Sequence, residues 1–462
     1  MDKYFKLSEN GTSVGKEVVA GITTFVTMAY IIFVNPSILS LAGMDASAVM
    51  VATCLASFLG TILIGLLSNY PFAQAPGMGL NAFFAFTICG TLGYSWQAGL
   101  AAVFVSGIIF IIITITGLRT KIVNAIPLSL KKAISGGIGL FIAYIGVKNA
   151  GFLKFTIDPG KYQDFSGTIV SDASAIPAFT FGSATAILSI IGLVITAILV
   201  VKKVRGSLLI GIVATSIIGA VMQFGFGIQL GMSLPEKFAV ASVAPTFGQF
   251  IYGFGELFQT SAGITTMIFS VIAVLISLTL VDMFDTIGTL IGTAGKGGFL
   301  DKDGNLPRAN RALLADAIAT TTGAIIGTST VTTYVESSAG IAEGGKTGLT
   351  SVVTSVLFLL AIVLSPLLGL VPTGATAPIL IIVGVMMMGA IKDIDWHDFT
   401  EAMPAFLTMA MMPFAYSIAD GIASGFIFYV IINLVTGKGK KTSPILYVIS
   451  LLFIIRYIIL AL

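Results

Sequence analysis

Long apolar runs separated by short polar breaks make up almost the whole chain. A helix that crosses the hydrocarbon core of a bilayer needs about 20 mainly apolar residues, and many of these runs have that length. The pattern predicts fourteen membrane segments, over residues 17–40, 48–68, 74–90, 96–117, 123–150, 181–201, 206–225, 262–292, 310–327, 329–342, 347–370, 374–391, 401–418 and 420–436. We therefore expect an all-α polytopic membrane protein.

Composition agrees with this fold class. Apolar residues make up 56% of the 462 positions, the mean hydropathy is +1.02 and only 10% of residues are charged, whereas soluble proteins have roughly 25% charged residues. The net charge of +3 is too small to indicate a nucleic-acid partner. Both cysteines lie in apolar runs, which argues against a disulfide framework. The polar first fifteen or so residues do not resemble a removable signal peptide, so the first span is expected to stay.

Basic residues predict the orientation, because cytoplasmic loops of membrane proteins are enriched in lysine and arginine. A cytoplasmic N-terminus places one set of basic residues on the inner side: Lys3, Lys6, Lys16, Arg119, Lys121, Lys202, Lys203, Arg205, Lys296, Lys302, Arg308, Arg311, Lys438, Lys440 and Lys441. The two longest breaks, near 152–180 and 226–260, then face outside. We expect a multi-pass protein of the cytoplasmic membrane, either inner or plasma.

The chain contains two similar halves. A shift of about 245 to 255 residues aligns Ile126-Pro127 with Val371-Pro372, each of which opens an apolar run, and aligns the third segment with the tenth. Because seven segments is an odd number, the second copy must have the inverted orientation, as in many secondary transporters. The predicted units are a first repeat, an external linker, a second repeat and a C-terminal segment, over residues 1–228, 229–261, 262–436 and 437–462. The apolar stretch 443–462 contains Arg456 and could be a fifteenth span or an interfacial helix, and we favour the interfacial helix.

The third and tenth segments cannot be ordinary spanning helices. In YPFAQAPGMGLNAFFAF, Pro71 and Pro76 prevent a continuous helix, so a helix can begin only after Pro76. In TSTVTTYVESSAGIAEGG, residues 328–335 are rich in Thr, Val and Tyr, which favour extended backbone. Each segment is predicted to be a short extended piece followed by a half-helix, an arrangement tolerated at membrane depth only where protein encloses it.

Asn81 and Glu336 occupy corresponding places near the start of the two half-helices. Unpaired N–H groups and the positive end of the helix dipole can hold a polar ligand there. Two structural alternatives remain. Glu336 could complete a capping box with Thr333, and Asn81 could simply satisfy backbone donors.

The eighth segment carries two acids within an apolar helix. Asp282 and Asp285 are three residues apart and therefore lie on or near one face. A buried aspartate costs roughly 2.5–3.5 kcal/mol on insertion scales, and no basic residue lies well inside a predicted span to compensate. We expect substrate or proton binding, with at least one carboxyl protonated part of the time.

These groups suit a flat, neutral ligand with N–H donors, and a nucleobase fits that description. Carboxylates accept hydrogen bonds from ring N–H groups, an amide can pair with a donor–acceptor edge, and Phe83, Phe84, Tyr334 or Phe284 could cover a ring face. The same chemistry would also allow a small amide or a zwitterion.

Four stretches together resemble AzgA-like purine nucleobase permeases, which are relatives of the uracil permeases. They are AGITTFVTMAYIIFVNP at 20–36, QAPGMGLNAFFAF at 74–86, LVDMFDTIGTLIGTAG at 280–295 and TYVESSAGIAEGGKTGL at 333–349. The resemblance covers essentially the whole chain. It implies a proton symporter for adenine, guanine or hypoxanthine, in which a core domain of segments 1–4 and 8–11 moves against a gate domain of segments 5–7 and 12–14. It also makes a homodimer plausible.

The resemblance implies that Gly79, Asn81, Asp282 and Glu336 contact the purine, and we expect Tyr334 and Val335 to lie beside it. Asp285 would be a supporting or proton-linked carboxylate, and Asp282 or Glu336 could also carry the proton. The preferred purine is not evident from these residues.

Other functions fit less well. An anion carrier or channel would call for a basic residue at the half-helix starts, and an intramembrane enzyme would leave the broken segments unexplained. GTAGKGG at 292–298 lacks the phosphate-loop spacing and DKDGN at 301–305 lacks the calcium-loop spacing. His397 has no second histidine or cysteine for a zinc site and is expected to be a solvated or interfacial residue. We expect no metal and no other cofactor.

Overall fold

The computed structural model describes residues 2–117, 125–156, 162–165, 168–171, 176–235, 239–258, 264–301 and 306–461. Three basic residues that enter the predicted orientation, Arg119, Lys121 and Lys302, lie outside these ranges, as do residues 259–261 at the end of the predicted external linker.

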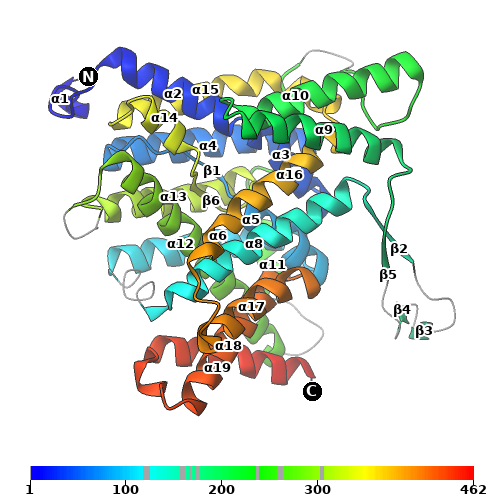
Figure 1. Cartoon of the computed structure of the whole chain (residues 1–462), viewed down its shortest axis with the longest axis vertical. Helices are drawn as coiled ribbons and strands as arrows, with labels where there is room; N and C mark the ends of the chain where they lie inside the picture. Colours follow the sequence, from blue (N-terminus) through cyan, green and yellow to red (C-terminus); the bar gives the residue numbers. More distant parts are fainter. Residues whose placement is uncertain are drawn as a thin grey trace.

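The described chain is mostly helical (Figure 1). The elements of its first half are α1 (Asp2–Phe5), α2 (Val14–Met28), α3 (Ile31–Leu39), η1 (Ser40–Ala42), α4 (Ala46–Ser68), β1 (Gln74–Pro76), α5 (Met78–Ala82), η2 (Phe83–Thr91), α6 (Trp96–Ile115), α8 (Leu128–Asn149), β2 (Leu153–Thr156), β3 (Tyr162–Phe165), β4 (Thr168–Ser171), β5 (Ile176–Phe179), α9 (Ala184–Val201), α10 (Ser207–Ala220) and η3 (Val221–Gly225). Those of its second half are α11 (Phe250–Leu257), α12 (Ile264–Gly297), α13 (Ala309–Ile326), β6 (Val331–Thr333), α14 (Ser337–Ala342), α15 (Gly348–Leu360), η4 (Ala361–Leu370), α16 (Thr373–Met388), η5 (Gly389–Asp393), α17 (Phe399–Phe414), α18 (Ile418–Val435), η6 (Gly439–Lys441) and α19 (Pro444–Ala461).

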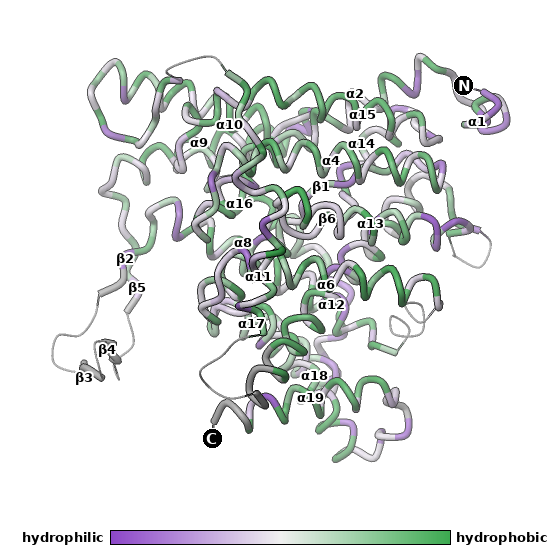
Figure 2. Tube along the Cα trace, turned by 180° about the vertical axis from the view of Figure 1, so that it is seen from behind, coloured by the Kyte–Doolittle hydropathy of each residue, from purple (hydrophilic) through white to green (hydrophobic). Residues whose placement is uncertain are grey.

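Ten helical stretches of the described chain are long and apolar enough to cross a membrane. Figure 2 shows hydrophobic residues along these helices and hydrophilic residues gathered mainly at their ends. The other four predicted segments correspond to shorter or more polar elements, namely β1 with α5 and η2, then α13, then β6 with α14, and finally α17. The polytopic helical fold is confirmed, whereas the count of fourteen spans and the inverted repeat remain predictions.

The two broken segments meet in the middle of the molecule, as the label positions in both views show (Figures 1 and 2). Strands β1 and β6 pair antiparallel, with Gln74 opposite Thr333 and Pro76 opposite Val331. Each predicted extended piece is thus a strand of three residues, and a short helix follows each one. The helix after β1 begins at Met78, directly beyond Pro76 and Gly77.

Neighbouring groups satisfy the backbone of these strands, as is required where water is excluded. The N–H of Gly77 donates to the carbonyl of Thr330 over 3.0 Å, and the N–H of Tyr334 donates to the carbonyl of Ala73 over 3.0 Å. On the other edge of β1, the N–H of Gln74 donates to the Thr61 hydroxyl of α4 over 2.9 Å. The irregular backbone is therefore enclosed by protein.

The helices pack in two groups around this centre (Figure 1). In one group α4 packs on α13 and α15, α2 packs on α14 and α15, and α6 packs on α13. In the other, α8 packs on α16 and α17, α9 packs on α10 and α16, and α17 packs on α18. Both broken segments join the first group, and α5 also contacts α8 of the second.

Three regions extend the helical bundle. Strand β2 pairs with β5 and strand β3 pairs with β4 in the break predicted to face outside. Within the predicted external linker, α11 packs on α6. The C-terminal α19 lies against α18 and α12, and the guanidinium of its Arg456 donates to Asp420 at the start of α18 over 3.0 Å.

Candidate substrate site

The first half-helix brings Gly79 and Asn81 into the buried centre. Gly79 lies so close to α8 that an added Cβ would meet the Cγ2 of Ile138 at 2.5 Å, so only glycine fits without a shift. The Asn81 side chain is buried, and its Oδ1 accepts a hydrogen bond from the Ser329 hydroxyl, just before β6. Its Nδ2 has no partner among the described residues. This segment therefore offers an unused amide donor.

The second half-helix offers an acid instead of an amide. Glu336 is the residue before α14, and its side chain does not cap that helix. Its carboxylate accepts a hydrogen bond from the Tyr30 hydroxyl over 2.7 Å, from the break between α2 and α3. The predicted alternative, a capping box between Glu336 and Thr333, is therefore not formed. The Tyr334 ring is buried and its hydroxyl donates to the carbonyl of Pro76, whereas the Val335 side chain is exposed.

The two acids of α12 have different surroundings. Asp282 is fully buried, with its oxygens 3.4 Å from the Thr286 hydroxyl and 3.3 Å from the Thr320 hydroxyl of α13. Asp285 is half-buried, and its Oδ2 lies 3.5 Å from the place where a Cβ on Gly77 would stand. Asp285 therefore faces the start of the first half-helix, while Asp282 lies between α12 and α13.

A third buried acid completes this group. Asp316 of α13 is fully buried, and its Oδ1 lies 2.9 Å from the Thr286 hydroxyl and 3.2 Å from the Gln74 Nε2 of β1. The Thr286 hydroxyl is also 2.8 Å from the Thr332 hydroxyl of β6. Thr286 thus connects two carboxyl groups and both helices to the strand pair.

The structure brings most of the predicted residues into one region. Gly79, Asn81, Asp285, Tyr334 and Glu336 lie at or beside the strand pair and the two half-helix starts. Asp282 instead faces α13, where it contacts the Thr320 hydroxyl.

Sequence reasoning missed Asp316, Gln74 and Tyr30. Asp316 shares the signal that pointed to Asp282, an acid within an apolar run, so the same criterion would have found it.

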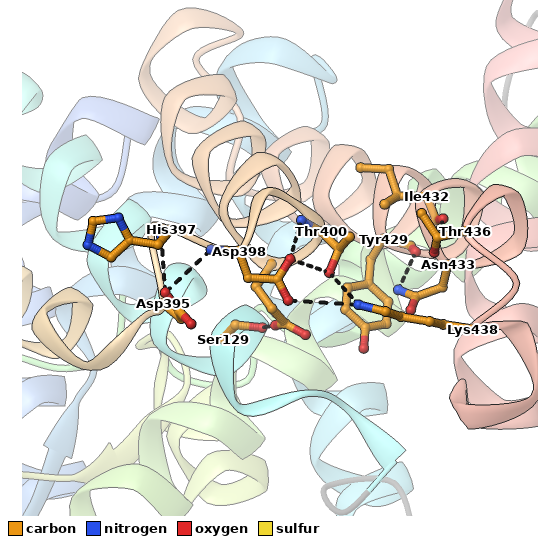
Figure 3. A network of polar contacts seen from close by, with 11 residues as sticks. Ser129, Asp395, His397, Asp398, Thr400, Tyr429, Ile432, Asn433, Thr436 and Lys438 are labelled. Carbon is orange, nitrogen blue, oxygen red and sulfur yellow. Dashed lines mark hydrogen bonds and ion pairs between the residues drawn. The ribbon is translucent and has the colours of Figure 1, made fainter.

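A polar network at the start of α17 has a different role (Figure 3). Asp398 accepts hydrogen bonds from the N–H and the hydroxyl of Thr400, over 2.9 and 2.8 Å, and Lys438 lies 3.8 Å away. The hydrogen bonds from Thr400, and then the charge of Lys438, lower the pKa of Asp398. The exposed His397 donates its backbone N–H to Asp395 while its ring points away. This network caps a helix.

Paired strands that lead into two half-helices, enclosed by spanning helices, define a membrane transporter with broken helices. Comparison with known sequences identifies the family. Residues 15–424 match the Permease family, and the chain belongs to that family.

Two relatives cover nearly the whole chain. The guanine/hypoxanthine permease PbuG of Bacillus subtilis is 43% identical and covers 100% of both chains. The adenine permease AdeP of Escherichia coli is 41% identical over 99% of this chain and 96% of its own. The resemblance to purine permeases is confirmed. The relatives are transport proteins and not enzymes, as expected.

Solved structures show the same fold at low sequence identity. The transmembrane domain of the cyanobacterial bicarbonate transporter BicA superposes with a TM-score of 0.62 at 14% identity, covering 89% of this chain and 97% of that domain. The structure of SLC26A9 gives a TM-score of 0.61 at 16% identity, covering 91% of this chain and 65% of that one. These neighbours support the transporter architecture.

Proposed function

We propose that this protein imports purine nucleobases across the cytoplasmic membrane, coupled to protons, by alternating access. The observation that carries the proposal is the pairing of an unused amide donor, Asn81, with the carboxylates Asp285 and Glu336 around one strand pair. A purine presents ring N–H donors and ring nitrogen acceptors on the same flat edge. Carboxylates bind the donors, and an amide N–H binds an acceptor.

The relatives support this substrate class, because they are named as adenine and guanine/hypoxanthine permeases. Tyr334 and Gly79 contribute by shape: the tyrosine ring is buried next to β1, and the glycine lets the first half-helix approach α8. Val335 borders Glu336 and is proposed as a peripheral contact.

The geometry favours exchanging the roles of the two aspartates of α12. Asp285 faces the half-helix start and is proposed to bind the base together with Glu336. Asp282 and Asp316 both contact the Thr286 hydroxyl inside the protein. Two buried carboxyl groups linked through one hydroxyl are costly to hold with full charge. We propose that this pair takes up the coupled proton.

Alternating access would follow from movement of the two helix groups. The proposed core domain consists of segments 1–4 and 8–11, which include both broken segments. The proposed gate domain consists of segments 5–7 and 12–14. The contact between α5 and α8 then crosses the moving boundary. The N-terminus would be cytoplasmic. We also expect a homodimer that forms through helices of the gate domain.

Uptake of radiolabelled hypoxanthine and adenine, measured separately in cells lacking their own purine carriers, tests the proposal. We expect saturable uptake of at least one base and its loss on adding a protonophore. Asp285→Asn should raise the apparent KM, whereas Asp282→Asn should remove the protonophore-sensitive accumulation. His397→Ala is a matched control, because His397 is exposed and belongs to the α17 cap.

Two results would reject the proposal. Absence of uptake of either base by well-expressed protein would reject purine transport. Normal uptake by both Asp285→Asn and Glu336→Ala would reject the assigned site.

A further inference from the structure

Four aromatic side chains meet where the first broken segment contacts the second helix group. This aromatic cluster consists of Phe86 of η2, Phe141 and Tyr144 of α8, and Tyr416 between α17 and α18. The Tyr416 ring centroid lies 5.5 Å from Phe86, 5.4 Å from Phe141 and 6.1 Å from Tyr144, and all three pairs are edge-to-face. Such pairs are favourable beyond the area that they bury.

Tyr416 has a backbone conformation that its side chain disfavours. It has a φ of +53° in the turn that ends α17, where the N–H of Ser417 donates to the carbonyl of Met412 over 3.0 Å. The left-handed residue just after a helix end is usually glycine, because a Cβ in this conformation comes too close to the following carbonyl oxygen. A bulky residue in this conformation often marks a functional position. Here the ring contacts hold it, together with Lys148 at 3.4 Å from its hydroxyl.

The cluster continues an interface that starts at the candidate site. Gly79 of α5 lies against Ile138 of α8 beside Asn81, and Phe86 of η2, which directly follows α5, contacts Phe141 further along α8. Phe86 lies seven positions after Gly79, which corresponds to roughly 10 Å along a helix axis. Both partners advance along the chain from the first contact to the second, from Gly79 to Phe86 and from Ile138 to Phe141, so the cluster lies beyond the site toward the C-terminal ends of η2 and α8.

We infer that Phe86, Phe141 and Tyr416 form a gate that closes the route between the candidate site and the side toward which α5 and α8 run. This inference rests on the proposed alternating access and orientation, in which that side is external. Phe86 belongs to the broken segment, whereas Phe141 and Tyr416 belong to the other helix group. When the groups separate, the edge-to-face contacts break and a flat aromatic substrate can pass.

Cysteine accessibility tests the gate without relying on a substrate. Ile138→Cys is introduced in a Cys54→Ala, Cys89→Ala background, which removes both native thiols. Intact cells are then treated with a membrane-impermeant thiol reagent. Adding Tyr416→Gly should raise the labelling rate about tenfold, because it removes the ring contacts while glycine accepts the turn conformation.

Two matched variants control for loss of structure. Tyr416→Phe keeps the ring and should label at the parent rate. Tyr252→Ala removes an exposed aromatic residue of α11 and should also leave the rate unchanged. Inside-out vesicles should show no increase with Tyr416→Gly, since the gate faces the other side.

Equal labelling of folded Tyr416→Gly and parent protein, or an equal increase from both sides of the membrane, would overturn the gate. If neither purine is taken up but Tyr416→Gly still increases external labelling, the proposed substrate fails and the gate stands. If purines are taken up and labelling is unchanged, the gate alone fails.

Discussion

The two broken segments share one backbone plan but differ in chemistry. Each has a strand of three residues followed by a short helix, and the strands pair with each other. The first presents the neutral amide of Asn81, whose Nδ2 is unused in the described structure, and the second presents the carboxylate of Glu336. A near-symmetric frame thus carries a donor on one side and an acceptor on the other. That asymmetry can orient a ligand that has both kinds of group.

The segments also differ in what holds them. The contact of Gly79 on α8 is with a side chain, that of Ile138. In the second segment, a Cβ on Gly340 would overlap the Thr24 hydroxyl and lie 2.5 Å from the Ala20 carbonyl of α2. A side-chain contact can adjust, whereas contact with backbone cannot. The first segment is therefore better suited to sliding, and the second to remaining fixed.

The largest expected effect concerns the acceptor side. Glu336→Ala should lower purine uptake at low substrate concentration about a hundredfold and Asn81→Ala about tenfold, because hydrogen bonds to charged groups are worth about twice neutral ones. Initial rates of uptake measure both. Asn81→Asp should transport less than Asn81→Ala, because it replaces the donor by an acceptor. An equal loss in the two alanine variants would contradict the asymmetry.

The difference in packing predicts a difference in rescue. Gly79→Ala should destabilise the protein by about 1–3 kcal/mol through overpacking, and Ile138→Ala should restore it, since only the Ile138 Cβ then remains, at 3.8 Å. Gly340→Ala should be destabilising too, but Thr24→Ala should not restore it because the Ala20 carbonyl remains. Thermal unfolding in detergent measures these changes. Rescue of both double variants would show that the two contacts are equivalent.

The smallest expected effects separate substrate binding from the stability of the folded protein. Tyr30→Phe removes the hydroxyl that donates to Glu336 and should raise the apparent KM about threefold to tenfold. Tyr334→Phe removes the bond to the Pro76 carbonyl, which joins the two segments. It should lower the free energy of unfolding by about 1 kcal/mol with little change in KM. Uptake kinetics and thermal unfolding of the same preparations measure both effects. A change in stability alone for Tyr30→Phe, together with a change in KM alone for Tyr334→Phe, would contradict this prediction.

Much of this site was predictable, since polar residues in apolar runs are few and costly. Asn81, Asp285 and Glu336 stand out in this way, and the prolines and β-branched residues indicated where the helices break. The role of Tyr30 was not predictable. A tyrosine in an apolar run is ordinary, and its partner is 306 residues away.

Position along a helix also limited the prediction. Asp282 and Asp285 are equivalent as acids three residues apart, but only packing shows that one faces α13 and the other faces the half-helix. The strand register depends on contacts between distant parts of the chain, which local sequence patterns do not contain.

The pairing of β1 with β6 has a consequence for biogenesis. Pro76 and Val331 are partners, yet more than half of the chain lies between them. At a synthesis rate of about 5–20 residues per second, the second strand emerges on the order of tens of seconds after the first. During that time the backbone groups of β1 have no strand partner, although leaving such groups unsatisfied in lipid is costly. The nascent first half must therefore wait at the membrane in a shielded or incompletely inserted state, and a truncated chain that ends before β6 should be a preferred target for membrane quality control.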